Sequence, residues 1–336
     1  MKYKVVVVGG GTGTHTVLRG LKLYAEYLDI TAIVSMADSG GSSGRLRDEF
    51  GQLPAGDVRN ALTALAADTD KNDLLLRQLF LYRFDRGTGL AGHSFGNLFI
   101  TALTEILGSE EKAIEAASSL LRVSGRVIPV TIEHTHIKAT YAGGREVLGE
   151  HQIDSPGHDP KERIVNLELS PSAKINPKAA DALKEAQLIV LGPGDLYTSV
   201  LANCVVSGFR EALAESGADI IYVCNLMSKA GQTVGFHAAE HLAEVEKYLK
   251  RKPTAIILNT SELPADIVAH YASEGNHPIL NNCTRNDLII YAFPLVGQRI
   301  EKHQADILDR SLIRHNPARL AEILFQHVSR HRLHIP

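Results

Sequence analysis

The first pattern in the chain that could do chemistry is a run of glycines and threonines directly after four valines. The valines span 5–8, and the run that follows is Gly9, Gly10, Gly11, Thr12, Gly13 and Thr14. Glycines at a strand end let the backbone approach a ligand closely, and a helix that starts there points its unpaired N–H groups and its positive end at the same place. The pattern therefore predicts a bound anion, most often a phosphate.

This turn matches no standard nucleotide-binding motif in full. The third glycine of the dinucleotide fingerprint is replaced by Thr14 or Thr16, depending on the register, and no Gly-Lys-Ser/Thr sequence closes the run as in a P-loop. A tight strand-to-helix turn that holds no ligand therefore stays open as an alternative.

A second turn of similar chemistry follows the apolar segment 186–191. Its residues are Gly192, Pro193, Gly194, Asp195, Leu196, Tyr197, Thr198 and Ser199. Two such turns in one parallel sheet are expected to face each other across a topological switch point, where ligands of open α/β sheets bind. A diphosphate that carries two headgroups would fit between them. The alternative is an ordinary connection with Ser199 as a helix cap.

Polar residues also follow the second apolar segment, 30–36. Asp38 stands at its carboxyl end, where a Rossmann-like protein meets a ribose or a reacting group. Arg45 follows within a Gly/Ser-rich stretch, and the planar fork of arginine suits phosphate or carboxylate recognition. A plain flexible linker is the alternative for this stretch.

Several further polar residues lie at expected helix starts or strand ends. Asp57 can cap a helix that runs to residue 65, and Arg59 and Asn60 in its first turn could point into the cleft. His93 and Asn97 are candidate polar liners of the same pocket. Arg314 precedes a helix that Asn316 and Pro317 should begin, and it could reach a phosphate or simply be solvated. Asn225, at the end of the apolar segment 219–226, completes this set.

These side chains need a parallel sheet to bring them together. Short apolar runs without polar alternation suit strands that are covered on both faces, and they occur at 5–8, 30–36, 186–191, 219–226, 255–259 and 289–293. From 126 to 150 the pattern changes to alternating apolar and polar residues with a glycine turn, which predicts antiparallel strands and a hairpin. We expect one domain over 1–336 with this hairpin inserted at about 126–170.

Composition excludes several functional classes. The 336 residues carry a formal net charge of −3, so there is no overall basic character that would indicate nucleic-acid binding. The three cysteines, Cys204, Cys224 and Cys283, form no CxxC pair, which suits reduced thiols in a cytosolic protein. No apolar run approaches the roughly 20 residues needed to span a bilayer. We therefore expect a cytoplasmic protein without a membrane span.

Two histidines have a spacing that is compatible with a metal. His134 and His136 would lie on one face of a strand, but no third ligand is apparent in the sequence. Half-exposed histidines on a strand need no metal, so we predict no metal at this pair.

Taken together, the motifs occur in a recognisable order. They are GGGTGT, MADSGGSSGRLR, LPAGDVRNAL, GHSFGNL, GPGDLYTSVL, NLMSKAGQT and IRHN, and they extend over nearly the whole chain. On these residues the chain resembles the gluconeogenesis factor (YvcK/GlmR) family of bacterial cytosolic proteins, within the larger superfamily of 2-phospho-lactate transferase, CofD.

That resemblance implies a Rossmann-like three-layer α/β/α fold with a mostly parallel sheet. It implies binding of UDP-sugars, UDP-N-acetylglucosamine in particular. It also implies a regulatory part in central carbon use, cell-wall precursor supply and cell shape. A protein partner and a homodimer are further expectations from the resemblance. By motif matching, Ser42 joins the residues named above as a ligand contact, and Tyr271 and Arg314 lie where the C-terminal segment closes over the nucleotide-sugar.

Two functions compete on this basis. One is a nucleotide-sugar sensor that binds its ligand without consuming it. The other is a CofD-like transferase, in which a hydroxyl attacks an activated phosphoryl group with Mg²⁺, and Asp38 is a metal ligand or base. Family members often carry two acids after the second strand, whereas here Ser39 follows Asp38, which favours the sensor. An oxidoreductase would rest on the fold alone.

Overall fold

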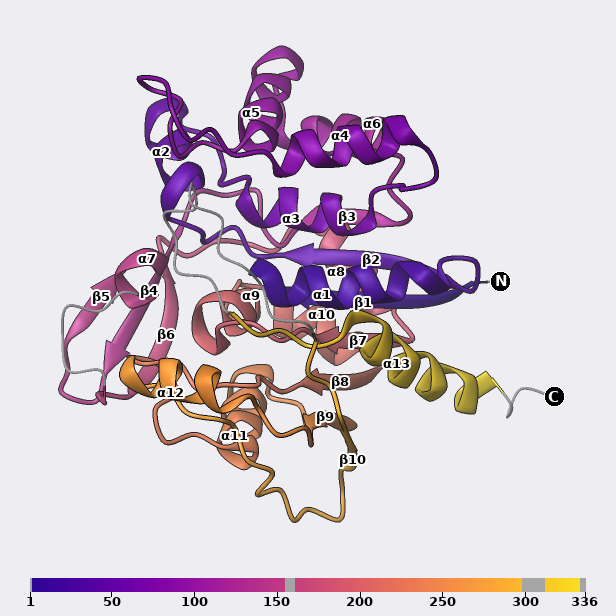
Figure 1. Ribbon diagram of the computed structural model, residues 1–336, viewed down its shortest axis with the longest axis vertical. Helices are drawn as coiled ribbons and strands as arrows, with labels where there is room; N and C mark the ends of the chain where they lie inside the picture. Colours follow the sequence, from indigo (N-terminus) through magenta and orange to yellow (C-terminus); the bar gives the residue numbers. More distant parts are fainter. Residues whose placement is uncertain (1, 155–160, 298–311, 333–336) are drawn as a thin grey trace.

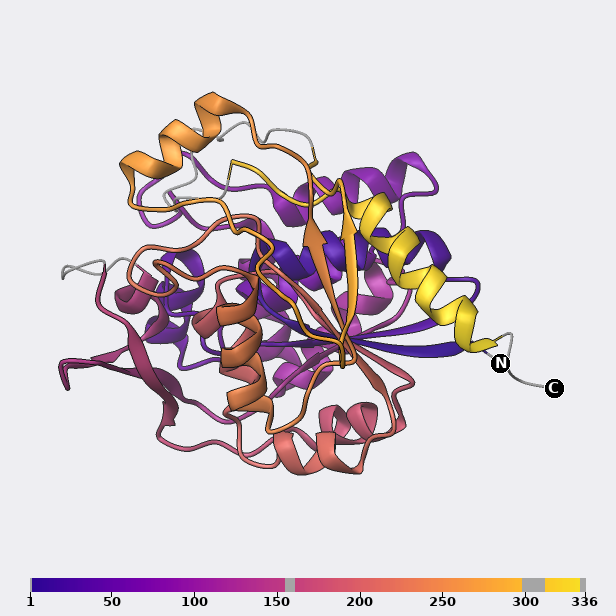
Figure 2. The same ribbon diagram turned by 90° about the horizontal axis from the view of Figure 1, so that it is seen from below.

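The computed structural model describes residues 2–154, 161–297 and 312–332. Within them, seven strands form one parallel sheet in the order β10-β9-β8-β7-β1-β2-β3 (Figures 1 and 2). The strands are β1 (Tyr3–Gly9), β2 (Leu28–Val34), β3 (Arg126–Pro129), β7 (Leu188–Leu191), β8 (Asp219–Val223), β9 (Ala255–Asn259) and β10 (Ile289–Phe293). The predicted α/β fold with a mostly parallel sheet is confirmed.

The continuous valine run at the start of the chain is explained by cover on both faces of the sheet. Val5 and Val7 belong to one buried cluster, and Val6 and Val8 belong to another. Successive side chains of a strand point to opposite faces, so an all-apolar strand needs a helical layer on each side. The structure supplies both layers, which makes it a three-layer fold.

One layer packs over the face that bears Val5 and Val7. Its helices are α1 (Gly11–Leu21), α3 (Gly56–Leu65), α4 (Lys71–Leu81), α5 (Phe95–Leu107), α6 (Glu110–Leu120) and α13 (Pro317–Arg332). The short 3₁₀ helix η1 (Lys22–Tyr24) extends α1, and α2 (Gly41–Phe50) lies beside α5. Asn316 and Ser94 cap α13 and α5 through bonds from the N–H groups of Arg319 and Asn97. The helix start at Asn316 was predicted from the sequence.

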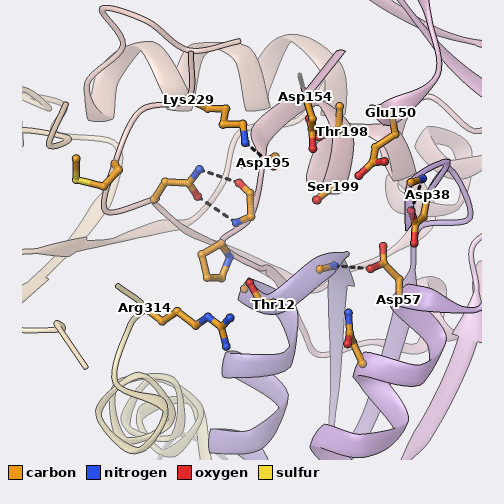
Figure 3. Close-up of a pocket in the computed structure, with 18 of the residues that line it drawn as sticks. Thr12, Asp38, Asp57, Glu150, Asp154, Asp195, Thr198, Ser199, Lys229 and Arg314 are labelled. Atoms are coloured by element: carbon orange, nitrogen blue, oxygen red, sulfur yellow. Dashed lines mark hydrogen bonds and ion pairs between the residues drawn. The ribbon is translucent and has the colours of Figure 1, made fainter. Parts of the chain in front are cut away.

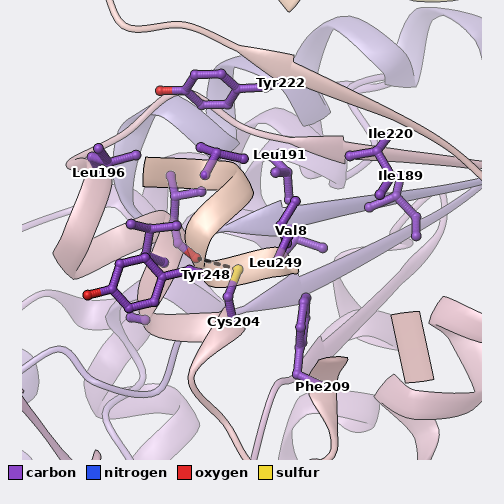
Figure 4. Close-up of a cluster of buried hydrophobic side chains, with 14 of the residues drawn as sticks. Val8, Ile189, Leu191, Leu196, Cys204, Phe209, Ile220, Tyr222, Tyr248 and Leu249 are labelled. Carbon is purple, nitrogen blue, oxygen red and sulfur yellow. Dashed lines mark hydrogen bonds between the residues drawn. The ribbon is translucent and has the colours of Figure 1, made fainter. Parts of the chain in front are cut away.

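The other layer covers the face that bears Val6 and Val8, shown in Figure 4. It is built from α8 (Pro177–Glu185), η2 (Leu196–Leu201), α9 (Ala202–Cys204), α10 (Phe209–Glu215) and α11 (Ala238–Leu249). The remaining helices are α7 (Glu150–Asp154) and α12 (Ala265–Ser273). No helix in the described part of the chain is both long enough and apolar enough to cross a membrane.

The antiparallel strands form a separate small sheet and do not extend the main one. Its order is β5 (Glu146–Leu148), β4 (His136–Tyr141), β6 (Ile164–Ser170). The alternation that begins at Arg126 suggested that the insertion starts there, but Arg126–Pro129 pairs in parallel with β2 in the main sheet. Residues 155–160 of the expected insertion lie outside the described residues.

The chain reverses its direction of sheet growth between β1 and β7. It first builds β2 and β3 on one side of β1, and it returns to add β7, β8, β9 and β10 on the other. The two glycine-rich turns therefore leave neighbouring strands at the same sheet edge, and they touch. A Cβ atom placed on Gly13 would lie 1.8 Å from the carbonyl oxygen of Pro193, so only glycine fits there.

This contact makes Gly13→Ala destabilising although alanine is the better helix former. We expect a loss of about 1–3 kcal/mol in the free energy of unfolding, the usual cost of an extra methyl group in a packed contact. Urea unfolding measures it. The matched control is Gly217→Ala, since a Cβ there meets no atom within 4 Å, and it should leave stability unchanged or slightly raised. Equal small effects from both changes would contradict the close contact of the two turns.

Candidate functional site

A cavity of about 650 Å³ opens at the carboxyl ends of the strands, where β1 and β7 lie side by side. Both glycine-rich turns line it. This is the switch point at which open parallel sheets bind ligands, and the volume lies in the range usual for small-molecule sites. The predicted convergence of the two turns is present in the structure.

Most of the residues that the sequence singled out line this cavity. They are Gly11, Thr12, Gly13, Asp38, Ser42, Asn60, Asn97, Gly194, Thr198, Ser199, Asn225, Tyr271 and Arg314. They come from segments as far apart as α1 and the approach to α13, and the sheet topology brings them together. Their part in ligand binding stays a prediction.

Six of the predicted residues do not line the cavity. One of them, His93, is buried, and its Nδ1 lies 3.1 Å from Oγ of the cavity residue Ser42. Gly10 packs against the carboxylate of Asp57, and Gly192 uses its N–H to bond the carbonyl of Val8. Thr14 is buried beneath the first turn, between Gly9 and Gly192. Gly10, Gly192 and Thr14 therefore shape the two turns without lining the cavity.

Tyr197 and Arg45 face elsewhere. The Tyr197 ring is buried in the core edge-on to Tyr248, and burial raises the pKa of its hydroxyl well above the ordinary value. The Arg45 guanidinium donates to the carbonyl of Ala91, 3.0 Å away, in an exposed position. Neither side chain is placed to contact a ligand in the cavity.

The first helix is capped by a carboxylate from another helix. Asp57 was expected to cap its own helix, α3, but its Oδ1 accepts from the N–H of Gly11, the first residue of α1, at 2.7 Å (Figure 3). The amide that could meet a ligand anion first is therefore already bonded. The positive potential at the start of α1 therefore acts both on Asp57 and on any ligand in the cavity.

The second turn is held in a similar way. The N–H of Gly194 donates to Asn225 Oδ1 at 3.1 Å, and Asn225 Nδ2 donates to the carbonyl of Gly194 at 2.7 Å. This pair of bonds fixes the turn after β7 to the end of β8. Asn225 thus positions the turn through a backbone clamp. The helix that follows, η2, is a π-helix, a rare form that is found often at functional sites.

Carboxylates gather on one side of the cavity. Figure 3 shows Asp38, Asp57 and Glu150 together, on the side away from Arg314 and Lys229. Burial, followed by repulsion from Asp38, raises the pKa of Asp57 to about 7. The same two causes in the same order raise the pKa of Glu150 well above its ordinary value. Both carboxyl groups ionise less readily than isolated ones, because they are buried and their charges crowd one another.

A second acid group adjoins the other turn. Asp154 accepts from the hydroxyl of Thr198 at 2.9 Å and from the amide of Gln232 at 2.6 Å. Burial and then the charge of Asp195 raise the pKa of Asp154 to about 8. Lys229 lies 3.8 Å from Asp195, and attraction to that carboxylate raises the pKa of the Lys229 ammonium.

Arg314 provides positive charge at the first turn. Its side chain extends toward Thr12 at the start of α1 (Figure 3). Burial first, then the positive charges of Arg77 and Arg314, lower the pKa of His15 on α1 to about 3, so His15 is neutral at pH 7. The positive side of the cavity therefore owes its charge to arginine and to Lys229.

Sequence reasoning missed much of the acidic wall. Glu150, His151 and Asp154 come from α7, in the inserted segment, and nothing in their local sequence marks them as cavity residues. Ser43, next to the predicted Ser42, also lines the cavity and was missed. Arg59 lines it as well, as its place in the first turn of the helix suggested. The motif SGGSSGRLR, which contains both serines, is the signal that could have included Ser43.

The acidic wall and the histidine pair hold the side-chain types that ligate metals. In residues 2–154, 161–297 and 312–332, no group of three or more His, Cys, Asp or Glu side chains is arranged to hold a metal ion. His136 Nδ1 lies 3.4 Å from an Arg47 guanidinium nitrogen, and His134 is exposed. A cation in this cavity would need ligands beyond the protein's own carboxylates.

Comparison with known proteins agrees with this architecture. The family model described as 2-phospho-L-lactate transferase CofD matches residues 5–292. A gluconeogenesis factor of Bacillus subtilis is 36% identical over 96% of this chain and 97% of its own length, and that of Halalkalibacterium halodurans is 38% identical over 97% and 96%.

A crystal structure of a Bacillus halodurans protein superposes with a TM-score of 0.85 at 35% identity, and the match covers 97% of this chain and all of the other (100%). A second crystal structure from that organism, of a protein described as a member of the UPF0052 family, gives a TM-score of 0.84. With matches of this extent in sequence and in fold, the chain belongs to the CofD family, in its gluconeogenesis factor group.

Proposed function

We propose that this protein is a nucleotide-sugar sensor, with UDP-N-acetylglucosamine as its first candidate ligand. The observation that carries the proposal is the cavity at the switch point, around which two glycine-rich turns, Arg314 and a wall of hydrogen-bond acceptors are brought together. The group name of its relatives supports a regulatory part in carbon metabolism. Through the ligand, we extend this role to cell-wall precursor supply and cell shape.

The lining offers a place for each part of such a ligand. The start of α1, beside Arg314, suits a diphosphate. The cavity end at Leu226, Tyr271 and Ile313 is apolar, since these side chains form a small buried cluster of their own, and it suits a nucleobase. The Tyr271 hydroxyl accepts from the N–H of Leu312 at 2.8 Å, which ties α12 to the segment that carries Arg314.

A sensor also needs a reader. We propose that the occupied state is recognised in the cytoplasm by a protein partner, and that the protein acts as a homodimer. The approach to α13 is the segment best placed to report occupancy. It joins the cavity at Arg314 to a helix that packs along α1.

A CofD-like transferase is the second candidate, favoured by the acidic wall. There a nucleotide-activated donor would meet an acceptor hydroxyl, with Asp38 as base or as a ligand of Mg²⁺. The residues that the structure describes offer too few grouped ligands for a metal cage, but Mg²⁺ is commonly held by one or two carboxylates and the phosphates of the substrate. When bound, the ion would neutralise phosphate charge.

The first prediction separates the two candidates. Purified protein mixed with UDP-N-acetylglucosamine, with and without Mg²⁺, should show a higher unfolding temperature because the ligand binds only the native state. Chromatography of the same mixture should recover the ligand intact. Breakdown or transfer of the ligand that depends on Mg²⁺ would favour the transferase, and no thermal shift in either condition would reject the nucleotide-sugar proposal.

The second prediction concerns the two arginines that the sequence proposed for the diphosphate. Arg314→Ala should weaken binding of UDP-N-acetylglucosamine by about 10- to 100-fold, because a hydrogen bond to a charged group contributes about 1.5–3 kcal/mol. Arg45→Ala is the matched control, since Arg45 bonds Ala91 outside the cavity, and its affinity should equal that of the wild type. Calorimetry measures both. Equal losses in the two variants would show that the cavity is not the binding site.

The third prediction follows from the raised pKa of Asp57. Its pKa of about 7 in the native state lies above the 3.8 of the unfolded chain, so the native state binds more protons and loses stability as the pH rises from about 4 to 7. Asp57→Asn removes this loss. The variant should be more stable than the wild type at pH 8, on the order of 1 kcal/mol, and the difference should shrink at pH 5.

The control variant should change the stability at pH 8 in the opposite direction. Bonds from Arg122, the largest cause, and from Thr69 lower the pKa of Asp73 to about 2, so this carboxylate stabilises the native state above pH 4. Asp73→Asn should therefore be less stable than the wild type at pH 8. Urea unfolding at both pH values reports the two variants together, and a destabilised Asp57→Asn at pH 8 would contradict the raised pKa of Asp57.

A further inference from the structure

Helix α4 is apolar on both of its faces. On the inner face Phe80 is buried, the centroid of its ring lies 5.1 Å from that of Phe99 on α5, and Leu76 packs against the same core. Helix α3 packs against both β2 and α4, and Figure 1 shows α4 beyond α3, on the outside of this layer. A surface helix in this position normally turns polar residues outward.

The outer face of α4 carries large apolar side chains that are about half exposed. They recur around the exposed Gln78 at the spacing of one helix face. Each is between 39% and 56% exposed, and they are Leu74, Leu75, Leu79, Leu81 and the adjoining Tyr82. Together they expose on the order of 500 Å², near the upper limit for the largest apolar patch of a monomer. We call these residues and Gln78 the α4 face, and a patch of this size marks an interaction site.

The area of the α4 face fits a contact between two copies of the chain. Two such faces laid against each other bury about 1,000 Å² or more of total surface, which is what a specific interface requires. Permanent homodimers commonly bury more than about 2,000 Å². A contact through the α4 face alone therefore predicts a reversible dimer, whose population depends on protein concentration.

Charges at the two ends of α4 favour a second copy in the antiparallel orientation. Lys71 begins the helix and Asp85 follows its end, and both side chains are exposed. Lys71 precedes Gln78 by the same number of residues by which Asp85 follows it. A two-fold axis at Gln78 therefore brings the Lys71 end of each copy to the Asp85 end of the other, whereas a parallel pair would place like charges together. The Gln78 amide both donates and accepts, so it can bond its own copy at the axis.

Building on the homodimer of the proposed function, we propose that the α4 face is the dimer interface, with the two α4 helices packed antiparallel around a two-fold axis at Gln78. The apolar side chains of each copy then cover those of the other, and the charged ends pair. Arg83, the residue after Tyr82, lines the cavity. The interface and the ligand site of each copy are thus joined by one short segment of chain.

Sedimentation velocity on the full chain without ligand, over a range of concentrations, tests the interface. The wild type should pass from monomer to dimer as its concentration rises. Leu75→Glu places a charge within the apolar contact and should weaken the dimer by more than about 10-fold. Leu148→Glu is the matched control, because Leu148 is 50% exposed on β5, which Figure 1 places far from α4. This control should dimerise like the wild type, and circular dichroism with the unfolding temperature reports the fold of each variant.

Charge reversal and crosslinking test the antiparallel arrangement. Lys71→Glu should weaken the dimer about two- to fivefold, the usual contribution of an exposed ion pair, and the further change Asp85→Lys should restore it. Gln78→Cys should form a crosslinked dimer on mild oxidation, because the two copies of this position meet at the axis, and the wild type should not. A double variant that dimerises no better than Lys71→Glu, or a Gln78→Cys variant without a crosslink, would overturn the arrangement.

The outcomes separate the interface from the function on which it rests. If the wild type dimerises and Leu75→Glu dimerises equally well with a native fold, another face forms the dimer, and the inference is wrong while the proposed homodimer stands. If the wild type stays monomeric at every concentration, the homodimer and the inference fail together. A thermal shift with UDP-N-acetylglucosamine on the same samples reports the sensor independently of both.

Discussion

The structure depends on a close contact between two turns that have no room for side chains. Gly13 and Pro193 meet because β1 and β7 are neighbours in the sheet and both turns leave it at the same edge. Parallel strands end on one side, so a reversal of strand order places two helix starts around one space. The cavity follows from that geometry, and every side chain that lines it is placed relative to this contact.

The cavity is divided by charge. Acceptors and partly protonated carboxylates gather around Asp38, whereas Arg314 and Lys229 lie on the opposite side. Asp57 links the two regions, because its carboxylate bonds the first amide of α1. A carboxylate at a helix start is stabilised by the helix field, while its charged neighbours oppose its ionisation. This division of charge favours an anion at the end that bears Arg314 and Lys229 and disfavours one beside the carboxylates.

The inserted sheet has a function in this arrangement. Its strands pack into the same core cluster as α8 and η2 through Ile137, Tyr141 and Leu167. The helix that follows β5 then delivers Glu150 and Asp154 to the cavity. The family to which the chain belongs includes a transferase by name, and the gluconeogenesis factor group by name suggests regulation. The acidic wall is the feature on which those two functions would differ.

The sequence by itself determined the fold class, both glycine-rich turns and most of the polar residues at the cavity. These could be predicted because local rules govern them: four valines in a row require cover on both faces, and glycines after a strand require a close turn. Local rules do not govern the orientation of Arg45 and Tyr197 or the helix that Asp57 caps. Which way Arg45 and Tyr197 point, and which helix Asp57 caps, depend on neighbours distant in the sequence, namely Ala91, Tyr248 and Gly11. Only the tertiary structure could decide these contacts. It also decided that Glu150 and Asp154 reach the cavity. The docking of the inserted sheet is set by packing across the core, and it leaves no mark in the local pattern of residues.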